Sequence, residues 1–385
     1  MVRTLALALL TGFWLWPMDS YAEDAPPSFT SRVFDGQSLS GWHVTGCEAG
    51  VENGLLVIKD GNGLVRADHR YRDFVLELSF KPRSAEKYDS GIYFRCELPP
   101  EGKPWPDKYQ INLKQGDEGN LIGFQDARSE GLIKPGEWNK LQLRVVGETA
   151  EMTINGQKAW KTSGITQREG YIAIQVEVPG GGQFEFKDIS ITELGYKSLF
   201  NGQDLTGWQG AGQDAAACWA VSDGLLVCDG KKGPWLRSAD QYDDFNVRFA
   251  YKLKAGGNSG MFIRVPEGGT HHGENSGIEV QLLDDAAERY AHLKPYQYTG
   301  SLYAIVPADP RVARPAGEWN TMEIDCRGTQ YRVIHNGVTV IQADATTTPE
   351  LAQRITKGFL GLQNHSEAVW FRDLRIGPSM QAAQQ

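Results

Sequence analysis

The chain has 385 residues and a formal net charge of −9 at pH 7, and 41% of its residues are hydrophobic. This length allows two or three domains with packed cores. The acidic charge and the lack of a basic run or stripe argue against nucleic acid as a partner, because binding to phosphates requires clustered cations.

Residues 1–22 predict a secretory signal. Arg3 precedes an apolar run from Leu5 to Trp16, and small residues lead to a cleavage site after Ala22. The run is shorter than the roughly 18 apolar residues that a membrane span requires. We therefore expect a periplasmic or secreted mature protein that is not anchored in a membrane.

The rest of the chain is an internal repeat. The segment "RVFDGQSLSGWHV" at 32–44 returns as "SLFNGQDLTGWQG" at 198–210, and further matching pairs follow in the same order. Such order over a long period indicates duplicated structural units. The repeat predicts a first domain at 28–194 and a second domain at 196–378.

Each unit has the pattern of an all-β domain. In the second unit, Phe245, Val247 and Phe249 alternate with less apolar residues, which is the period of a half-buried strand. Turn signals such as Asn336-Gly337 separate many short runs of this kind. The pattern predicts an antiparallel β-sandwich of the jelly-roll type in each domain.

The two copies differ where chemistry would need special residues. The strand "GIEVQLLDD" at 277–285 carries Glu279, whereas the first copy has Gln110 at that position. His365 in the last part of the second copy faces Glu177 in the first. A requirement of the fold alone would constrain both copies, so these differences mark Glu279 and His365 as candidates for a function of the second domain.

The second copy also carries about a dozen extra residues after this strand, a length within the range of functional loops. They supply His292, Lys294, Tyr298 and Tyr303. Polar and aromatic side chains in an added loop are typical of a binding or catalytic site.

Strand alternation places Glu279 and Gln281 on the opposite face from Val280 and Leu282. We therefore expect the acid on the open face of the sandwich, together with His365 and Arg264. A carboxylate, an imidazole and a guanidinium in one place form a plausible acid–base site.

The cysteines and the remaining histidines define no metal site by their spacing. Cys218 and Cys228 lie on facing strands of a hairpin, and both a disulfide and two free thiols are compatible with that position. His271 and His272 are adjacent, and neighbours on an extended strand point to opposite faces, so both could bind one ion only in a loop.

Taken together, the motifs of both units resemble the 3-keto-disaccharide hydrolase domain family, which is built on the concanavalin A-like lectin/glucanase jelly roll. The resemblance covers the second unit almost completely and the first more loosely. It implies two tandem concanavalin A-like sandwiches. The motifs that carry it are "LFNGQDLTGW" at 199–208, "NSGMFIR" at 258–264, "GIEVQLLDD" at 277–285, "TGSLYAIVPA" at 299–308, "GEWNTMEI" at 317–324, "HNGV" at 335–338 and "GLQNHSEAVWFRDLRI" at 361–376.

The resemblance implies hydrolysis of glycosides whose sugar has first been oxidised to a ketone at carbon 3 by a partner oxidoreductase. The ketone acidifies the proton on carbon 2, so a base can remove it, and the aglycone then leaves carbon 1 before water adds. Carried onto this chain, Glu279 and His365 are the base and the acid in either order, and Arg264 stabilises negative charge. The implied substrate contacts are Gln281, Asp284, Tyr303 and Asn364.

One position departs from the family pattern, which usually has Asp before the histidine of the last motif. Here that residue is Asn364. If the aspartate binds a metal or orients the histidine, this copy could be weaker or independent of metal. The sequence requires no cofactor, although a divalent cation bound by Glu279 and His365 is an open alternative.

Two other functions suit the same fold. A carbohydrate-binding protein without catalysis would need no acid–base pair. An ordinary glucanase should have two carboxylates two to four residues apart on one strand, and Gln281 stands where the second would be needed. The first unit lacks both the acid and the histidine, so we interpret it as a degenerate copy. The substrate and the oligomeric state are left open.

Overall fold

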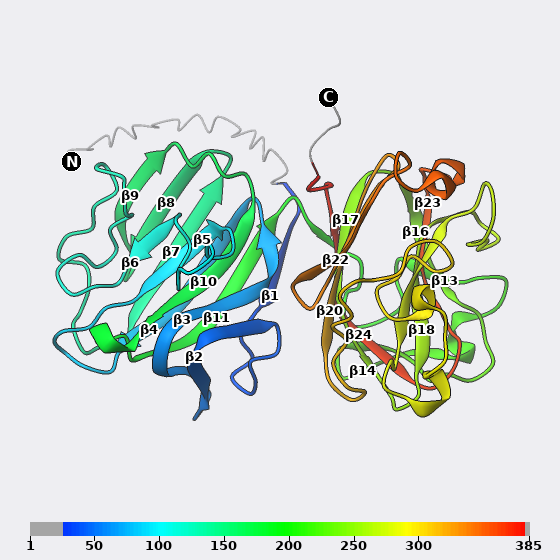
Figure 1. The fold of residues 1–385 in the computed structure, drawn as a ribbon, viewed down its shortest axis with the longest axis horizontal. Helices are drawn as coiled ribbons and strands as arrows, with labels where there is room; N and C mark the ends of the chain where they lie inside the picture. Colours follow the sequence, from blue (N-terminus) through cyan, green and yellow to red (C-terminus); the bar gives the residue numbers. More distant parts are fainter. Residues whose placement is uncertain (1–25, 382–385) are drawn as a thin grey trace, which may run out of the picture.

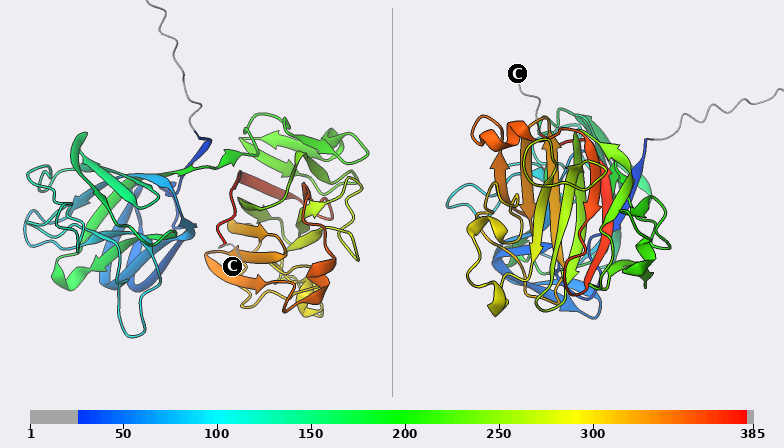
Figure 2. Two further views of the ribbon diagram at one scale, coloured as in Figure 1. Left: turned by 90° about the horizontal axis from the view of Figure 1, so that it is seen from above. Right: turned by 90° about the vertical axis from the view of Figure 1, so that its right-hand side faces the viewer.

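The computed structural model describes residues 26–381, and the predicted signal at 1–22 lies outside this range. Figure 1 shows two β-rich bodies side by side, and Figure 2 shows that the chain passes between them at one edge. Within the described range, no helix is long and apolar enough to cross a membrane.

The first domain is one curled antiparallel sheet that folds over its own core. Its path order is β6-β5-β10-β3-β11-β4-β7-β8-β9, with β1 on β11 and β2 on β3. The strands are β1 (Ser28–Arg32), β2 (Trp42–Glu52), β3 (Leu55–Tyr71), β4 (Phe74–Pro82), β5 (Gly91–Cys96), β6 (Gln110–Asn112), β7 (Asn139–Val146), β8 (Thr149–Ile154), β9 (Gln157–Ser163), β10 (Gly170–Glu177) and β11 (Phe184–Leu194), with one 3₁₀ turn, η1 (Val178–Gly180).

The second domain has two separate antiparallel sheets. The larger has the order β14-β15-β24-β17-β20-β21-β22 with β12 on β24, and the smaller has the order β13-β16-β23-β18-β19. The strands are β12 (Lys197–Ser198), β13 (Trp208–Gly210), β14 (Trp219–Ser222), β15 (Leu225–Cys228), β16 (Leu236–Tyr242), β17 (Phe245–Leu253), β18 (Asn258–Val265), β19 (Ile278–Leu283), β20 (Asn320–Arg327), β21 (Gln330–His335), β22 (Val338–Ala343), β23 (Gly358–Leu362) and β24 (Val369–Gly377). Four 3₁₀ turns are η2 (Ala215–Ala217), η3 (Glu288–Tyr290), η4 (Pro295–Gln297) and η5 (Pro349–Gln353).

The number of sheets differs because one strand is continuous in only one domain. In the first domain, β3 pairs with β11 near its start and with β10 toward its end, so it passes from one layer to the other. In the second domain, residues 229–235 interrupt the equivalent strand and divide it into β15 and β16. The smaller sheet of the second domain is thereby an independent layer.

Alternating side chains build a separate apolar core in each domain. In β4, for example, Phe74, Leu76, Leu78 and Phe80 are buried and the residues between them are half-buried. The described residues form no α-helix, and all sheet pairs are antiparallel. The chain is therefore all-β, with two tandem jelly-roll sandwiches, as the sequence predicts.

One strand departs from simple alternation. In β17, Phe249 points into the core as expected, but Asn246 and Arg248 on the other face are also fully buried. They are covered because the first domain packs against this sheet. The Arg248 guanidinium forms ion pairs with Glu193 of β11 and, at 3.3 Å, with Glu323 of β20. Burial alone would raise the pKa of Glu323, but the charge of Arg248, together with His69 and the charge of Arg332, holds that pKa well below its usual range.

Candidate functional site

A cavity lined by three histidines and a glutamate lies on the smaller sheet of the second domain. The cavity has a volume of about 370 Å³ and lies over β18 and β19. Its lining residues are Asn258, His271, His272, Glu279, Gln281, Leu283, Tyr290, Leu293, Gln297, Tyr303, Gln363 and His365.

Strand β19 places the acid as its alternation predicts. Val280 and Leu282 are fully buried in the core, and Glu279 and Gln281 line the cavity on the opposite face. Glu279 is nevertheless only 3% exposed, because loops cover the open face. Gly260 on β18 lies beside it, and a Cβ atom there would lie 2.4 Å from the Glu279 Oε1 atom. The glycine leaves the space that the carboxyl group occupies.

Burial dominates the electrostatics of Glu279. It raises the pKa of this carboxyl group to about 8, and a hydrogen bond from Gln363 opposes part of that effect. The His271 imidazole lies beside this carboxyl group, with its Nε2 atom 3.3 Å from Oε2. A carboxyl group with such a pKa retains its proton near neutral pH and can donate it.

The two adjacent histidines share this cavity because they lie in the loop between β18 and β19. The ring of His271 stacks on Phe262 with 4.5 Å between centroids, and the ring of His272 is 4.1 Å from that of His271. Neighbouring side chains point to opposite faces on an extended strand, whereas in this loop both imidazoles line the same cavity. The repeat carries the signal that identifies them, since the first copy has Gly102 and Lys103 at these positions.

His365 reaches the cavity from the segment after β23. Burial lowers its pKa, and the positive charge of Arg289 lowers it further. The imidazole is therefore neutral at pH 7 and can accept a proton.

The added loop forms a wall of the cavity. Residue Leu302 bridges to Val280, and the backbone N–H of Tyr303 donates to the Glu279 carbonyl at 2.8 Å, so this segment extends the edge of β19. The Tyr303 hydroxyl accepts a hydrogen bond from Gln297 at 2.9 Å. Of the four loop residues expected from the sequence, Tyr303 lines the cavity, and His292, Lys294 and Tyr298 do not.

Arg264 lies elsewhere, which corrects its assignment to the site. It is 1% exposed, and its guanidinium donates to the Asp243 carbonyl at 2.7 Å and pairs with Asp244 at 3.2 Å. Its counterpart Arg95 makes the same kind of contacts, with Asp73 at 2.9 Å. The two copies share this arginine because it ties loops together in both domains.

Asp284 and Asn364 are also not among the residues that line the cavity. Asp284 accepts a hydrogen bond from the backbone of Gly256 at 2.7 Å. The Asn364 amide donates to the Lys231 carbonyl at 2.7 Å and contacts the sulfur atoms of two cysteines, Cys218 and Cys228, each at 3.2 Å. The structure therefore corrects both predicted substrate contacts, and it has the two cysteines as free thiols.

The same region of the first domain is filled by its own side chains. Gln110 accepts a hydrogen bond from the Tyr93 hydroxyl at 2.9 Å and donates to Gln175 at 2.6 Å. Gln175 in turn donates to Glu177, and Trp105 packs over the neighbouring apolar cluster. These amides are paired with one another, which is consistent with a copy that has no acid–base site of its own.

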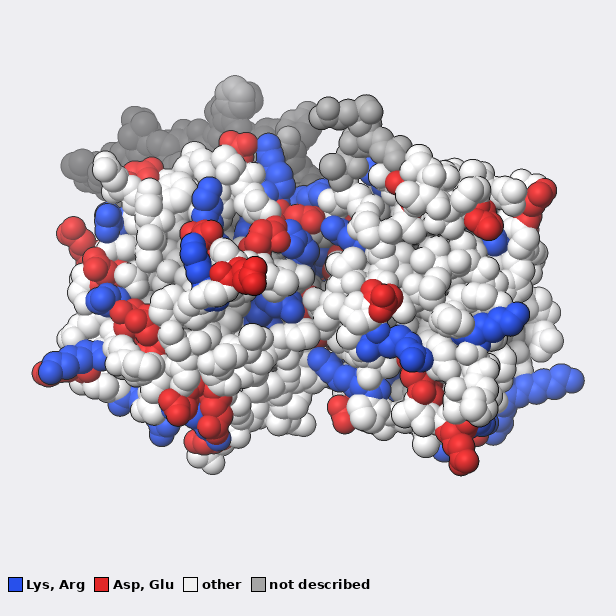
Figure 3. All heavy atoms as spheres, viewed as in Figure 1, with Lys and Arg blue, Asp and Glu red and all other residues white. Residues whose placement is uncertain are grey.

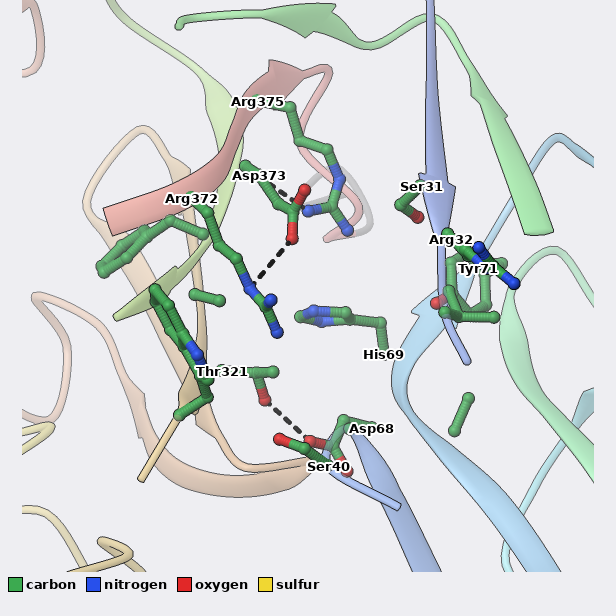
Figure 4. Close-up of a pocket in the computed structure, with 16 residues that line it drawn as sticks. Ser31, Arg32, Ser40, Asp68, His69, Tyr71, Thr321, Arg372, Asp373 and Arg375 are labelled. Atoms are coloured by element: carbon green, nitrogen blue, oxygen red, sulfur yellow. Dashed lines mark hydrogen bonds and ion pairs between the residues drawn. The ribbon is translucent and has the colours of Figure 1, made fainter. Parts of the chain in front are cut away.

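A second, smaller cavity of about 80 Å³ lies between the domains (Figure 4). Its polar side chains pair across the interface. Thr321 of the second domain donates to Asp68 of the first at 2.8 Å, and His69 of the first domain lies 3.3 Å from Glu323 of the second. These contacts serve to hold the domains together.

The surface carries charges of both signs. On the face drawn in Figure 3, basic and acidic side chains are interspersed over both domains, and no large area of one sign is visible on that face.

Comparisons with known proteins agree with the resemblance seen in the motifs. A family model described as a 3-keto-alpha-glucoside-1,2-lyase-like domain matches residues 30–192 and again 195–377. A "3-keto-disaccharide hydrolase" of Bacteroides thetaiotaomicron is 27% identical over 228 residues, which cover 47% of this chain and 78% of the relative.

Two solved structures from Parabacteroides distasonis, each called a "putative glycosyl hydrolase", are also similar. They are 27% and 28% identical to this chain, cover 48% of it, and are themselves covered to 94% and 98%, with TM-scores of 0.42. The family model accounts for nearly the whole described chain. This protein therefore belongs to the family of 3-keto-alpha-glucoside-1,2-lyase-like domains, of which it carries two copies.

Proposed function

We propose that the second domain cleaves glycosides whose sugar carries a ketone at carbon 3. The family and the relatives indicate a carbohydrate-acting, glycosyl hydrolase-like protein. One observation carries the finer proposal. Glu279, which is protonated near neutral pH, and His365, which is neutral there, line one cavity of the second domain.

The chemistry that we propose begins with His365 as the base. The neutral imidazole takes the proton from carbon 2, and the electron pair of that bond moves toward the ketone oxygen to form an enediolate. The carboxyl group of Glu279 donates a hydrogen bond to this oxygen as its negative charge grows. A buried carboxylic acid is suited to this role because it offers a proton without a competing charge.

Elimination then follows. The electron pair returns to form a double bond between carbons 1 and 2, and the bond from carbon 1 to the aglycone oxygen breaks. The charged imidazole of His365 supplies the proton that this oxygen takes. Addition of water across the double bond gives the free 3-keto sugar, so the overall reaction is a hydrolysis.

Polar groups around the cavity would hold the sugar hydroxyl groups. Gln281 and Tyr303 are our candidates, because both line the cavity beside Glu279. We also propose that the protein acts outside the cytoplasm, as residues 1–22 predict, on sugars oxidised by a partner oxidoreductase.

The test compares a 3-keto-glucoside with its unoxidised parent, using a chain that begins at Glu23. We expect release of aglycone from the keto form alone, and a fall in kcat of at least about a hundredfold in Glu279→Gln and in His365→Ala. Gln110→Ala is the matched control in the first domain and should keep full activity.

Equal rates for the wild type and both variants would rule out this mechanism. Tight binding of the parent glycoside without any cleavage of the keto form would instead favour the carbohydrate-binding function.

A further inference from the structure

We propose that His271, His272 and Glu279 together bind one divalent transition-metal ion. One ligand atom from each of these residues lies within 4.8 Å of the other two. The sequence suggested Glu279 and His365 as ligands. In the structure, the imidazoles of His271 and His272 form the group with Glu279 instead.

The orientation of His271 is the first support. Its Nδ1 atom is 3.0 Å from the Gly269 carbonyl oxygen, and a carbonyl in that place accepts an N–H. The proton then sits on Nδ1, which leaves the lone pair of Nε2 directed at Glu279, 3.3 Å away. A backbone carbonyl that fixes the second nitrogen is a recurrent feature of metal-binding histidines.

Unpaired oxygen atoms are the second support. Gln363 Oε1 and Asn258 Oδ1 are buried in the same cavity and have no hydrogen-bond partner among residues 26–381. Glu279 is 3% exposed, and no Lys or Arg side chain among residues 26–381 forms an ion pair with it. A bound cation would satisfy these oxygens and offset the cost of burying the carboxylate.

The donor types define the class of ion. Two imidazoles and one carboxylate favour Zn²⁺, Co²⁺, Mn²⁺ or Ni²⁺ over Mg²⁺ and Ca²⁺, which prefer oxygen ligands alone. Three protein ligands leave positions open for substrate.

The role of the ion rests on the proposed function. The ketone oxygen and a neighbouring hydroxyl group of a 3-keto sugar are placed to chelate one cation through a five-membered ring. The ion would then take the place of the Glu279 proton in stabilising the enediolate.

The first domain supplies an internal control. It has Gly102, Lys103 and Gln110 at the three ligand positions. The proposal therefore requires one ion per chain, although the chain has two copies of the fold.

The experiment measures Co²⁺ binding to the chelator-treated protein, by calorimetry and by the visible absorption of the bound ion. We expect one Co²⁺ per chain, and binding weaker by at least about a hundredfold in His271→Gln, His272→Gln and Glu279→Gln. His292→Gln, on the exposed part of the added loop, is the control and should bind as the wild type does.

Unchanged circular dichroism and unfolding midpoints would establish that the variants are folded. Two ions per chain, no binding, or binding of equal strength in the three variants would overturn the proposal. Co²⁺ binding without cleavage of keto-glycosides would leave the site standing and refute the function. Full cleavage of keto-glycosides by a protein that binds no ion would refute the metal site and leave the proposed function standing.

Discussion

The glycine beneath the acid offers a sharp test of the site. Gly260 is in β18, and a Cβ atom built there would lie 2.4 Å from Oε1 of Glu279 and 2.9 Å from its Cγ atom. The φ angle of Gly260 is not in the left-handed region, so an alanine can adopt the backbone conformation. The substitution Gly260→Ala therefore acts through the contact with Glu279.

The geometry sets the size of the effect. Ordinary van der Waals contact for a Cβ atom begins at 3.4 Å, so the carboxyl group has to move by about 1 Å. A displacement of that size in a reacting group costs about a hundredfold in rate. Overpacking should also lower the free energy of unfolding by about 1–3 kcal/mol.

The first domain contains the matched control. A Cβ atom at Gly91 would lie 2.4 Å from Nε2 of Gln110 and 2.8 Å from Oε1 of Gln175, so Gly91→Ala should cause a similar loss of stability. It should not change the cleavage of a 3-keto-glucoside. The assays are urea unfolding and kcat/KM for both variants.

The reasoning would be refuted if Gly260→Ala kept kcat/KM within about threefold of the wild type, since the position of Glu279 would then have little importance for the reaction. An equal loss of activity in Gly91→Ala would also refute it, because the effect would then follow from stability alone.

Two further predictions concern buried charges. Arg248→Ala removes the cation that Glu193 and Glu323 share and leaves these buried carboxylates with only Arg375 and His69, so it should lower the free energy of unfolding by about 3–5 kcal/mol. Lys254→Ala breaks an exposed pair and should cost only about 0–1 kcal/mol. Urea unfolding measures both, and equal losses would contradict the role of burial. The pKa of Glu279 is about 8 in the folded protein, above its value in the unfolded chain. Its contribution to the free energy of unfolding is therefore fully present below about pH 4.5 and decreases as the pH rises to 8. At about 1.4 kcal/mol per pKa unit, the free energy of unfolding of the metal-free wild type should therefore fall by a few kcal/mol relative to that of Glu279→Gln between about pH 5 and pH 8. If the free energies of unfolding of the two proteins ran parallel over this pH range, the prediction would be wrong.

The sequence predicted side-chain positions correctly where the two-residue alternation of a strand determines them. A strand turns successive side chains to opposite faces, so Val280 and Glu279 separate into core and cavity whatever surrounds them. The two copies of the repeat also identified the acid, because Gln110 at the position of Glu279 shows that the strand itself needs no carboxylate.

The same reasoning failed for side chains outside regular strands. His271 and His272 lie in a loop, where alternation does not apply, and their common direction depends on contacts with Phe262 and Gly269. Arg264 has a positive φ angle near the end of β18, so its side chain does not follow the alternation of faces that the motif predicts.

The sequence by itself determined the all-β class, the duplication, and the face on which Glu279 lies. These follow from local periodicity and from matching motifs, which need no knowledge of distant contacts. Only the tertiary structure decided which polar groups share the cavity. It brought the histidine loop to Glu279, turned Arg264 and Asn364 toward neighbouring loops, and buried Arg248 beneath the first domain. Such contacts join residues far apart in the chain, and their partners are set by packing of the whole fold.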